Sequence, residues 1–366
     1  MHLSELLFLI GFIVCVVGIL VVDMLVIDRK AHVVSIKEAG AWTGVWVGLA
    51  LAFSLFLWFH GDMVHGIHTF ADLQEVSAKY AAHLKLDPAD FEGGLNQFRR
   101  FMTISYISGY LIEETLSVDN LFVMMMIFAS FGVGKNEYQH VLNWGILGAI
   151  VLRFIFIFAG AAIINRFDWV LLFFGAFLLY SGVKMFLNRN KQEQIEVSKH
   201  PMVRFLSKYF HVYPSFVGDK FFVRARKTAD GYELVPKHSA TGGKALRCIT
   251  PLFVTVLVIE FSDLIFAFDS IPAVFSVSRD PYVVFFSNIF AVLGLRSMFF
   301  LLAAIADKFR YLKTGVCVLL LFIGAKLLLH DVVEIGAVTS LVFILAVMVV
   351  SVGASVLIPK KSEPTK

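Results

Sequence analysis

Six residues with carboxylate side chains lie inside two long apolar stretches of the chain. The first stretch reads LIEETLSVDNLFV at 111–123, and the second reads VIEFSDLIFAFDSIPAVF at 258–275. An ionisable side chain at mid-membrane depth is costly, so such residues usually face a cavity or a partner and mark a functional site. The chemistry open to them is the binding of cations, of protons, or of both. The six are Glu113, Glu114, Asp119, Glu260, Asp263 and Asp269.

The two stretches share one spacing of polar residues. In each, two carboxylates stand six residues apart and an amide or hydroxyl side chain follows directly, which pairs Glu113, Asp119 and Asn120 with Asp263, Asp269 and Ser270. On an α-helix, positions seven apart share a face, whereas positions six apart differ by about 120°. Each helix therefore presents its first carboxylate and its amide or hydroxyl on one face.

Glu260 joins the face of Asp263 at a spacing of three residues. Asp119 and Asp269 would miss these faces on a regular helix, and they could reach the same cavity if the helix unwinds locally. Pro272 favours such a break in the second stretch, because proline clashes with the carbonyl group four residues earlier, here that of Phe268.

The side chains of these motifs indicate a hard divalent cation. Carboxylate, amide and hydroxyl oxygens suit Mg²⁺, Ca²⁺ and Mn²⁺. Neither motif contains His or Cys, which argues against a dedicated zinc or copper site. Three methionines, Met124 to Met126, follow the first motif and could offer thioether ligands, although helix packing explains them as well.

Four basic residues accompany the acids in the apolar stretches: Arg153, Lys184, Arg296 and Lys326. They could neutralise the carboxylates as buried ion pairs that merely hold the helices together. Four bases leave two of the six acids uncompensated if all are ionised. A divalent cation would balance this charge, and so would two protons. We favour the cation and keep pure scaffolding as the alternative.

The similarity of the two motifs extends into an internal repeat. Leu147–Gly148 and Arg153 correspond to Leu293–Gly294 and Arg296, and a Gly-x-Lys triplet ends at Lys184 in one copy and at Lys326 in the other. Each copy contains three apolar segments, so the second copy must cross the membrane in the opposite sense. Inverted repeats with a site at the midplane where they meet are typical of secondary transporters.

The composition of the chain indicates a membrane protein, so the acidic motifs and the repeat lie in membrane-spanning segments. Hydrophobic residues make up 58% of the 366-residue chain and charged residues only 16%. A spanning helix needs roughly 20 apolar residues, and the sequence predicts about nine such helices in an all-α polytopic protein. The first apolar run is too long for a cleaved signal peptide and lacks a basic start. Cys15, Cys248 and Cys317 are too far apart for a typical metal or disulfide motif.

Loop charges predict the orientation. Alternate loops carry 22 Arg and Lys residues on one side of the membrane and 6 on the other. The basic side is normally cytoplasmic, which places the N-terminus outside and the C-terminus in the cytoplasm. The predicted units are two N-terminal helices (1–60), an extracytoplasmic loop (61–103), the first repeat (104–187), a cytoplasmic loop (188–250), the second repeat (251–330), and a last helix with a cytoplasmic tail (331–366).

The two long loops are expected to contain small elements of their own. Segment 61–103 predicts a helix over 71–86 followed by a break at Pro88 and Gly93–Gly94. Segment 188–250 predicts a short helix over 201–210 and then a hairpin, in which 221–223 faces 232–235 across an Asp230–Gly231 turn. Neither segment is large enough to be a catalytic domain.

Several of these motifs resemble the TerC/Alx family of integral membrane proteins. The resemblance is carried by LSVDNLFV at 116–123, TPLFVTVLVIEFSDLIFAFDSIPAVF at 250–275, SNIFAVLGLR at 287–296 and AWTGVWVGLAL at 41–51, and it covers nearly the whole chain. It implies manganese efflux. The family's acidic motif maps onto Glu113, Asp119, Asn120, Glu260, Asp263, Asp269 and Ser270. Glu114 falls where family members vary, and loop 61–103 is longer than is usual in the family.

We therefore expect a multi-pass protein of the cell's inner membrane that exports Mn²⁺ by alternating access. Protons are a candidate counter-ion, and no cofactor beyond the transported metal is expected. The alternatives are transport of another hard divalent cation, chiefly Ca²⁺, and a non-transporting scaffold or metal-delivery partner for exported proteins. The sequence contains no P-loop, dinucleotide fingerprint or nucleophile–base constellation, so an enzyme is not predicted. The net charge of +4 requires no nucleic-acid partner, and the oligomeric state stays open.

Overall fold

The computed structural model describes residues 3–23, 34–167, 169–188, 201–228, 231–235, 246–305, 311–329, 332–333, 335 and 337–357. Within these ranges the chain forms eleven α-helices and one small sheet. The long helices are α1 (Leu3–Val22), α2 (Ile36–His60), α4 (Phe91–Phe131), α5 (Tyr138–Arg166), α6 (Trp169–Asn188), α8 (Pro251–Phe275), α9 (Pro281–Ile305), α10 (Leu312–Leu328) and α11 (Ala337–Leu357).

The smaller elements lie between these helices in sequence. They are the 3-10 helix η2 (Gly61–Val64), the helices α3 (Phe70–Tyr80) and α7 (Pro201–Tyr209), and the strands β1 (Phe222–Thr228), β2 (Gly231–Leu234) and β3 (Leu246–Ile249). Strand order in the sheet is β2-β1-β3, with both neighbours antiparallel to β1.

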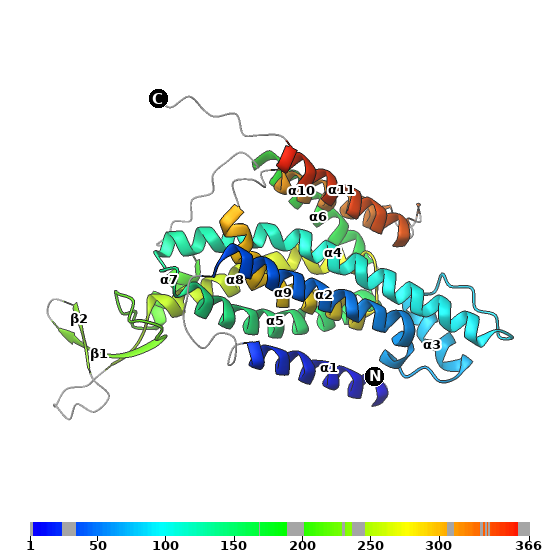
Figure 1. The fold of residues 1–366 in the computed structure, drawn as a ribbon, viewed down its shortest axis with the longest axis horizontal. Helices are drawn as coiled ribbons and strands as arrows, with labels where there is room; N and C mark the ends of the chain where they lie inside the picture. Colours follow the sequence, from blue (N-terminus) through cyan, green and yellow to red (C-terminus); the bar gives the residue numbers. More distant parts are fainter. Residues whose placement is uncertain are drawn as a thin grey trace.

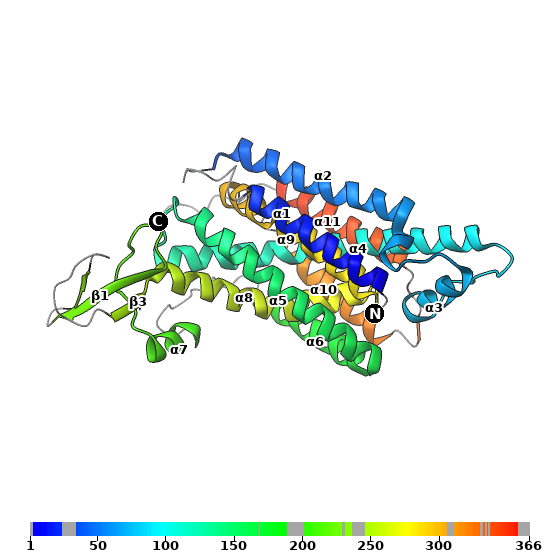
Figure 2. The same ribbon diagram turned by 90° about the horizontal axis from the view of Figure 1, so that it is seen from below.

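The long helices run side by side along the longest axis of the molecule (Figures 1 and 2). Seven of them are long and apolar enough to cross a membrane: α1, α2, α5, α6, α8, α9 and α11. Two further helices, α4 and α10, were predicted as spans from the sequence but are not among these seven. The prediction of an all-α polytopic membrane protein is confirmed. Among the seven, α9 is the most deeply buried and lies within the bundle.

The two long inter-span segments lie at opposite ends of the bundle. Figure 1 shows the sheet beyond one end and α3 beyond the other, and we call these the sheet end and the α3 end. This agrees with the prediction that 61–103 and 188–250 occupy opposite faces of the membrane. Which end faces the cytoplasm stays a prediction from the loop charges.

The predicted boundaries in segment 61–103 were partly wrong. The expected helix over 71–86 is shorter, because α3 ends at Tyr80. The expected break at Gly93–Gly94 is instead the first turn of α4, which begins at Phe91 after the cap residue Asp90. The Asp90 side chain accepts a hydrogen bond from the Gly93 amide at 2.8 Å, and this cap offsets the poor helix propensity of the two glycines.

The predicted hairpin exists, but its register was wrong and a strand was missed. The paired residues run from Ala225↔Leu234 to Thr228↔Gly231, later in the first strand than expected. Val223 pairs instead with Cys248 of β3, which the sequence analysis did not predict. Strand β3 has only four residues, LRCI, and this pattern is too short to predict a strand from the sequence alone. Its pairing with β1 becomes evident only in the fold.

The helices of the two predicted repeats pack against one another: α4 and α5 each contact both α8 and α9, and α6 packs on α10. The glycines of the two Gly-x-Lys triplets allow the last pair to approach closely. A Cβ atom at Gly324 would lie 2.8 Å from the backbone nitrogen of Leu179 on α6, and one at Gly182 would lie 3.2 Å from Leu320 Cβ on α10. The internal repeat and its inverted sense stay predictions from the sequence.

The expected local unwinding is absent from both motif helices. Helix α8 is continuous from Pro251 to Phe275 with Pro272 inside it, and α4 is continuous from Phe91 to Phe131. Proline removes one backbone hydrogen bond, and the packing of α8 against α4, α5 and α6 holds the helix through that position.

Candidate cation site

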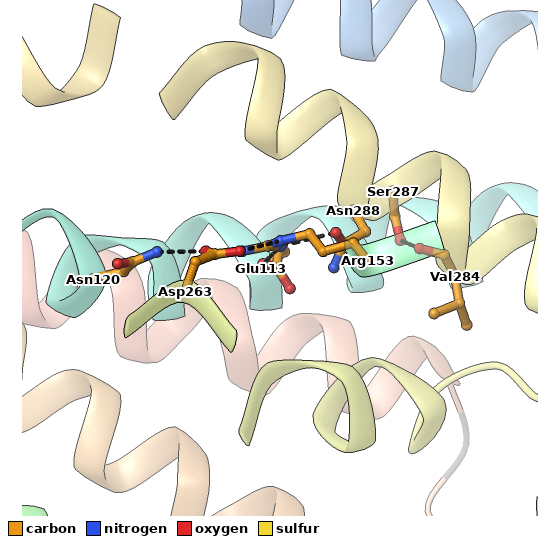
Figure 3. Close-up of polar contacts among 7 residues, drawn as sticks. All are labelled: Glu113, Asn120, Arg153, Asp263, Val284, Ser287 and Asn288. Carbon is orange, nitrogen blue, oxygen red and sulfur yellow. Dashed lines mark hydrogen bonds and ion pairs between the residues drawn. The ribbon is translucent and has the colours of Figure 1, made fainter. Parts of the chain in front are cut away.

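Arg153 of α5 lies at the centre of the polar interior, with its guanidinium group between the two motif helices (Figure 3). It forms an ion pair with Glu113 of α4, and its Nη2 donates to Asp263 Oδ1 of α8 at 3.0 Å. Its Nη1 also donates to Asn288 Oδ1 of α9 at 2.8 Å. One side chain thus connects four helices, and its exposed fraction is only 1%.

A second amide completes this network. The Nδ2 atom of Asn120 donates to Asp263 Oδ1 at 2.8 Å, so α4 and α8 are also joined directly. Glu113, Asn120 and Asp263 are all buried. The predicted shared face of Glu113 and Asn120 agrees with these contacts, because Glu113 pairs with Arg153, Asn120 donates to Asp263, and Arg153 and Asp263 are themselves paired. The two carboxylates outnumber the single guanidinium, which leaves one negative charge in the network when both are ionised.

A small cavity of about 20 Å³ adjoins this network, between α4, α6, α8 and α10. A cavity must offer roughly 10–15 Å³ to hold one water molecule, so this one has room for a single water-sized particle. Its polar lining residues are Glu113, Ser117, Asn120, Arg153, Asp269 and Ser270, and its other lining residues are Leu116, Met185, Phe266, Val316 and Leu320.

Four of the polar residues that line the cavity have buried oxygen atoms without a hydrogen-bond partner in the described part of the chain. The atoms are Glu113 Oε2, Ser117 Oγ, Asn120 Oδ1 and Ser270 Oγ. Buried polar atoms are nearly always hydrogen-bonded, so a group of exceptions at one place requires an explanation. A bound cation would supply it, because oxygen lone pairs without donors are what a hard cation needs.

Asp269 reaches the same cavity although α8 does not unwind. Its Oδ1 atom accepts a hydrogen bond from Ser181 Oγ of α6 at 2.9 Å. Asp269 and Ser270 are consecutive, and both line the cavity. On a regular helix Asp269 does not share the face of Ser270, but the cavity extends around α8 toward α6, so both residues line it.

Glu260 lies apart from the cavity lining, against α5. Both of its carboxylate oxygens are buried and make no hydrogen bond with described residues. Gly148 provides the space, because a Cβ atom there would lie 2.3 Å from Glu260 Oε1. The Leu-Gly pair that marked the repeat in the sequence therefore has a steric role at this position.

Glu114 points away from the cation cavity. A Cβ atom at Gly294 of α9 would lie 3.6 Å from Glu114 Oε1, and Trp46 of α2 flanks the same glycine. The carboxylate is buried on that side of α4. This position separates Glu114 from the residues that line the cavity.

Three of the four basic residues that could neutralise the motif acids lie away from the cavity. Arg296 donates to Asp23 Oδ2 at 2.5 Å and to Asn143 Oδ1 at 2.7 Å, so its acid is at the end of α1. The Nζ atom of Lys326 donates to Ser340 Oγ of α11 at 2.9 Å. Lys184 is exposed and lies near the Tyr180 ring. Arg153 joins the motif acids Glu113 and Asp263.

The predicted ligand set is therefore brought together in part. One cavity is lined by Glu113, Asn120, Asp269 and Ser270. Asp263 does not line it but forms an ion pair with Arg153, which does. Glu260 lies apart, next to Gly148. The side chain of Asp119 lies outside the described residues. No group of three or more His, Cys, Asp or Glu side chains is arranged to hold a metal ion in the part of the chain that the structure describes. A cation would be held by a mixed set of oxygens.

Four residues at or near the site were missed in the sequence: Ser117, Ser181, Met185 and Asn288. Ser117 and Asn288 stand inside motifs that the sequence analysis quoted, SVDN and SNIF, so a polar residue in an apolar run was a usable signal. Ser181 and Met185 had no signal, because a serine and a methionine on an apolar helix are ordinary packing residues.

The fold and the site together define a polytopic membrane protein with a buried, acidic, oxygen-lined cavity between its helices. Residues 99–363 match the model of the integral membrane protein TerC family, and the chain belongs to that family. The predicted family resemblance is confirmed. No solved structure matches the chain significantly.

Curated relatives match over almost their full lengths. An uncharacterized membrane protein of Myxococcus xanthus is 39% identical over 97% of this chain and 93% of its own length. A protein of Escherichia coli K12 named as the membrane-bound redox modulator Alx is 37% identical over 93% of this chain and 91% of its own. The tellurium resistance protein TerC of Serratia marcescens is 35% identical, over 96% and 94% respectively.

Proposed function

We propose that this protein is a divalent-cation transporter of the bacterial inner membrane, and that Mn²⁺ export is its activity. The observation that carries the proposal is the cavity beside Arg153, lined by residues with four buried oxygen atoms that have no donor among the described residues. The cavity lies between α4 and α8, the two helices with matching acidic motifs. A site between matched helices suits alternating access, in which one set of helices moves against the other.

The charge around the cavity supports a divalent cation. Glu113, Asp263 and Asp269 contribute three negative charges when ionised, and Arg153 contributes one positive charge. The difference is two, which one divalent cation neutralises. Because Arg153 forms its ion pairs with Glu113 and Asp263, its own charge is compensated and opposes a cation less.

The names of the relatives suggest two other roles, redox modulation and tellurium resistance. The cysteines of this chain offer little support for thiol chemistry at the site. Cys15 lies on α1, Cys248 on β3 and Cys317 on α10, and none of them lines the cavity. Metal export would affect both phenotypes indirectly, through the metal content of the cell.

The proposed transport is tested with purified protein in liposomes that contain a manganese-quenched dye. The native chain should carry Mn²⁺ into the liposomes, and Asp269→Asn should abolish this flux while the variant still inserts. In cells, Asp119→Ala and Asp269→Ala should each remove protection against excess manganese. Lys184→Gln, an exposed change outside the cavity, is the matched control. Normal manganese flux in the Asp269 variant at equal insertion would refute the site.

The same liposomes discriminate the alternatives. Ca²⁺ flux at comparable concentrations would favour the calcium transporter. Absence of flux for every divalent metal would favour a non-transporting scaffold or metal-delivery partner. Proton exchange is tested separately, by following the lumen pH during Mn²⁺ entry without an imposed voltage. A constant lumen pH would refute exchange and leave transport intact.

A further inference from the structure

One residue that lines the cavity has a sulfur-containing side chain, which also packs against the main apolar core. Met185 of α6 is one of its lining residues and the only sulfur-containing one among them. The oxygen-bearing lining side chains that could act as ligands are Glu113, Ser117, Asn120, Asp269 and Ser270. With Met185 they make six candidate donors, five hard and one soft.

The position of Met185 is fixed by its own helix. Ser181 stands one helical turn before Met185 on the same face of α6, and it donates a hydrogen bond to Asp269 at 2.9 Å. Gly182 brings α6 against Leu320 of α10, which lines the cavity too. These two contacts hold α6 against α8 and α10 at the level of the cavity.

None of the three methionines considered as ligands on α4, Met124 to Met126, lines the cavity. Met124 and Met125 pack in a separate apolar cluster that includes Phe128 and Phe299. The sequence hypothesis of a thioether ligand therefore moves from α4 to α6.

A thioether changes which cations the cavity prefers. Ca²⁺ takes six to eight oxygen ligands, and Mg²⁺ demands oxygen ligands and gives up its water reluctantly. A site with room for about one water molecule strips the ion of most of its hydration, so a sulfur in place of an oxygen penalises both hard ions. Transition-metal ions accept a softer donor more readily.

We propose that Met185 is a specificity-determining residue whose thioether contacts the bound cation and favours Mn²⁺ over Ca²⁺ and Mg²⁺. This inference rests on the proposed function, because it requires that the cavity bind a divalent cation. The inference adds a chemical reason why the site would bind Ca²⁺ and Mg²⁺ less tightly than Mn²⁺.

The test is competitive binding to the purified full-length protein. Free Mn²⁺ is measured by its electron paramagnetic resonance signal while Ca²⁺ or Mg²⁺ is titrated as competitor. Met185→Leu keeps the apolar volume and removes the sulfur. It should reduce the preference for Mn²⁺ over Ca²⁺ by roughly tenfold, the lower end of the change expected when a group that supports a metal site is removed. Binding of Cd²⁺, a softer ion, should weaken more than binding of Mn²⁺.

Met185→Gln gives the converse test, because it places an oxygen donor of similar length at the same position. It should raise the relative affinity for Ca²⁺ and Mg²⁺ above that of the native protein. Met298→Leu on α9 is the matched control, since Met298 packs in the separate apolar cluster and does not line the cavity. Its selectivity should equal that of the native chain.

The outcomes separate the two proposals. If the native protein does not retain Mn²⁺, the proposed function fails and the role of Met185 fails with it. If the native protein binds Mn²⁺ and both Met185 variants keep its selectivity, the inference is wrong while the proposed function stands. Should Met185→Leu fail to fold, the Gln variant decides alone, and unchanged selectivity there overturns the inference.

Discussion

At the scale of single residues, the structure assigns different partners to side chains that are equivalent in the repeat. Arg153 joins the motif acids Glu113 and Asp263, whereas its counterpart Arg296 joins Asp23. The first arrangement surrounds the cavity, and the second fastens α1 to α9. Positions that match in the sequence therefore have different partners in the fold, and only Arg153 of this matched pair lines the cavity.

We predict that Arg153→Met destabilises the protein by about 3–5 kcal/mol, the usual cost of removing one partner from a buried ion pair. The loss leaves Glu113 and Asp263 buried without their guanidinium group. Arg153→Lys should be intermediate, since a single ammonium group cannot bridge both carboxylates as the planar guanidinium does. Thermal unfolding in detergent measures the effect, with Lys184→Met as an exposed control. Equal unfolding temperatures for Arg153→Met and the native chain would contradict the structural role of the pair.

Gly148 gives a second prediction at this scale. A methyl group at Gly148 would collide with the Glu260 carboxylate, whose Oε1 lies 2.3 Å from the Cβ position. Gly148→Ala should therefore displace Glu260 and reduce manganese flux if Glu260 contributes to the transport path. Gly48→Ala on α2 is the control, because a Cβ atom there meets nothing within 4 Å. Full flux in Gly148→Ala would remove Glu260 from the path.

At the scale of elements, a buried histidine connects three segments at the α3 end. The Nδ1 atom of His65 lies 2.9 Å from Glu5 Oε1 of α1, and its Nε2 atom lies 2.8 Å from Asp280 Oδ2 before α9. Tyr282 of α9 donates to the other Glu5 oxygen at 3.3 Å, and the Tyr80 ring of α3 flanks the imidazole. Carboxylates accept only, so both ring nitrogens donate and the histidine is charged.

The pKa of His65 governs the pH range in which this contact holds. Burial alone would lower the pKa, but the carboxylates of Asp280 and Glu5 raise it from 6.5 to about 9. Because the folded-state pKa is the higher one, the contribution to stability is complete below about 6.5 and is lost as the pH rises through about 9.

We predict that His65→Gln lowers the unfolding temperature strongly at neutral pH and little above the folded-state pKa of about 9. The difference between native and variant proteins should shrink as the pH rises, because the native histidine then loses its charge as well. Hydrogen exchange of α1 should show the same trend, with the exposed His83→Gln as control. A difference that stays constant with pH would show that the contact does not depend on the charge of His65.

At the scale of the whole molecule, the bundle has two distinct ends, with the sheet beyond one and α3 beyond the other (Figure 1). The chain is a multi-pass membrane protein, and its loop charges predict that the sheet end is cytoplasmic. Export would then carry the cation from the sheet end toward the α3 end.

Cysteine labelling tests this orientation. In a background that lacks the exposed Cys15, a membrane-impermeant reagent should label Gln74→Cys on α3 from outside intact cells. It should not label Glu233→Cys on β2 until the membrane is opened. Both positions are exposed, so accessibility within the fold does not limit the reaction. The reverse labelling pattern would overturn the orientation and the assigned direction of transport.

Local patterns in the chain were enough to predict the membrane class, the principal spans, the short helix α7 and the β1–β2 hairpin. Hydropathy and turn residues act over a few neighbouring positions, so a linear sequence records them. The shared face of Glu113 and Asn120 was predictable for the same reason, since helical periodicity relates residues on one helix.

The partners across helices required the fold. Periodicity fixes which residues share a face of one helix, but it does not fix how that helix is rotated against its neighbours. Packing of α4 on both α8 and α9 sends Glu113 toward Arg153 and the adjacent Glu114 toward Gly294. The close approach of α6 and α10 then places Met185 at the cavity. These contacts join residues far apart in sequence, and only the summed packing of the whole bundle determines them.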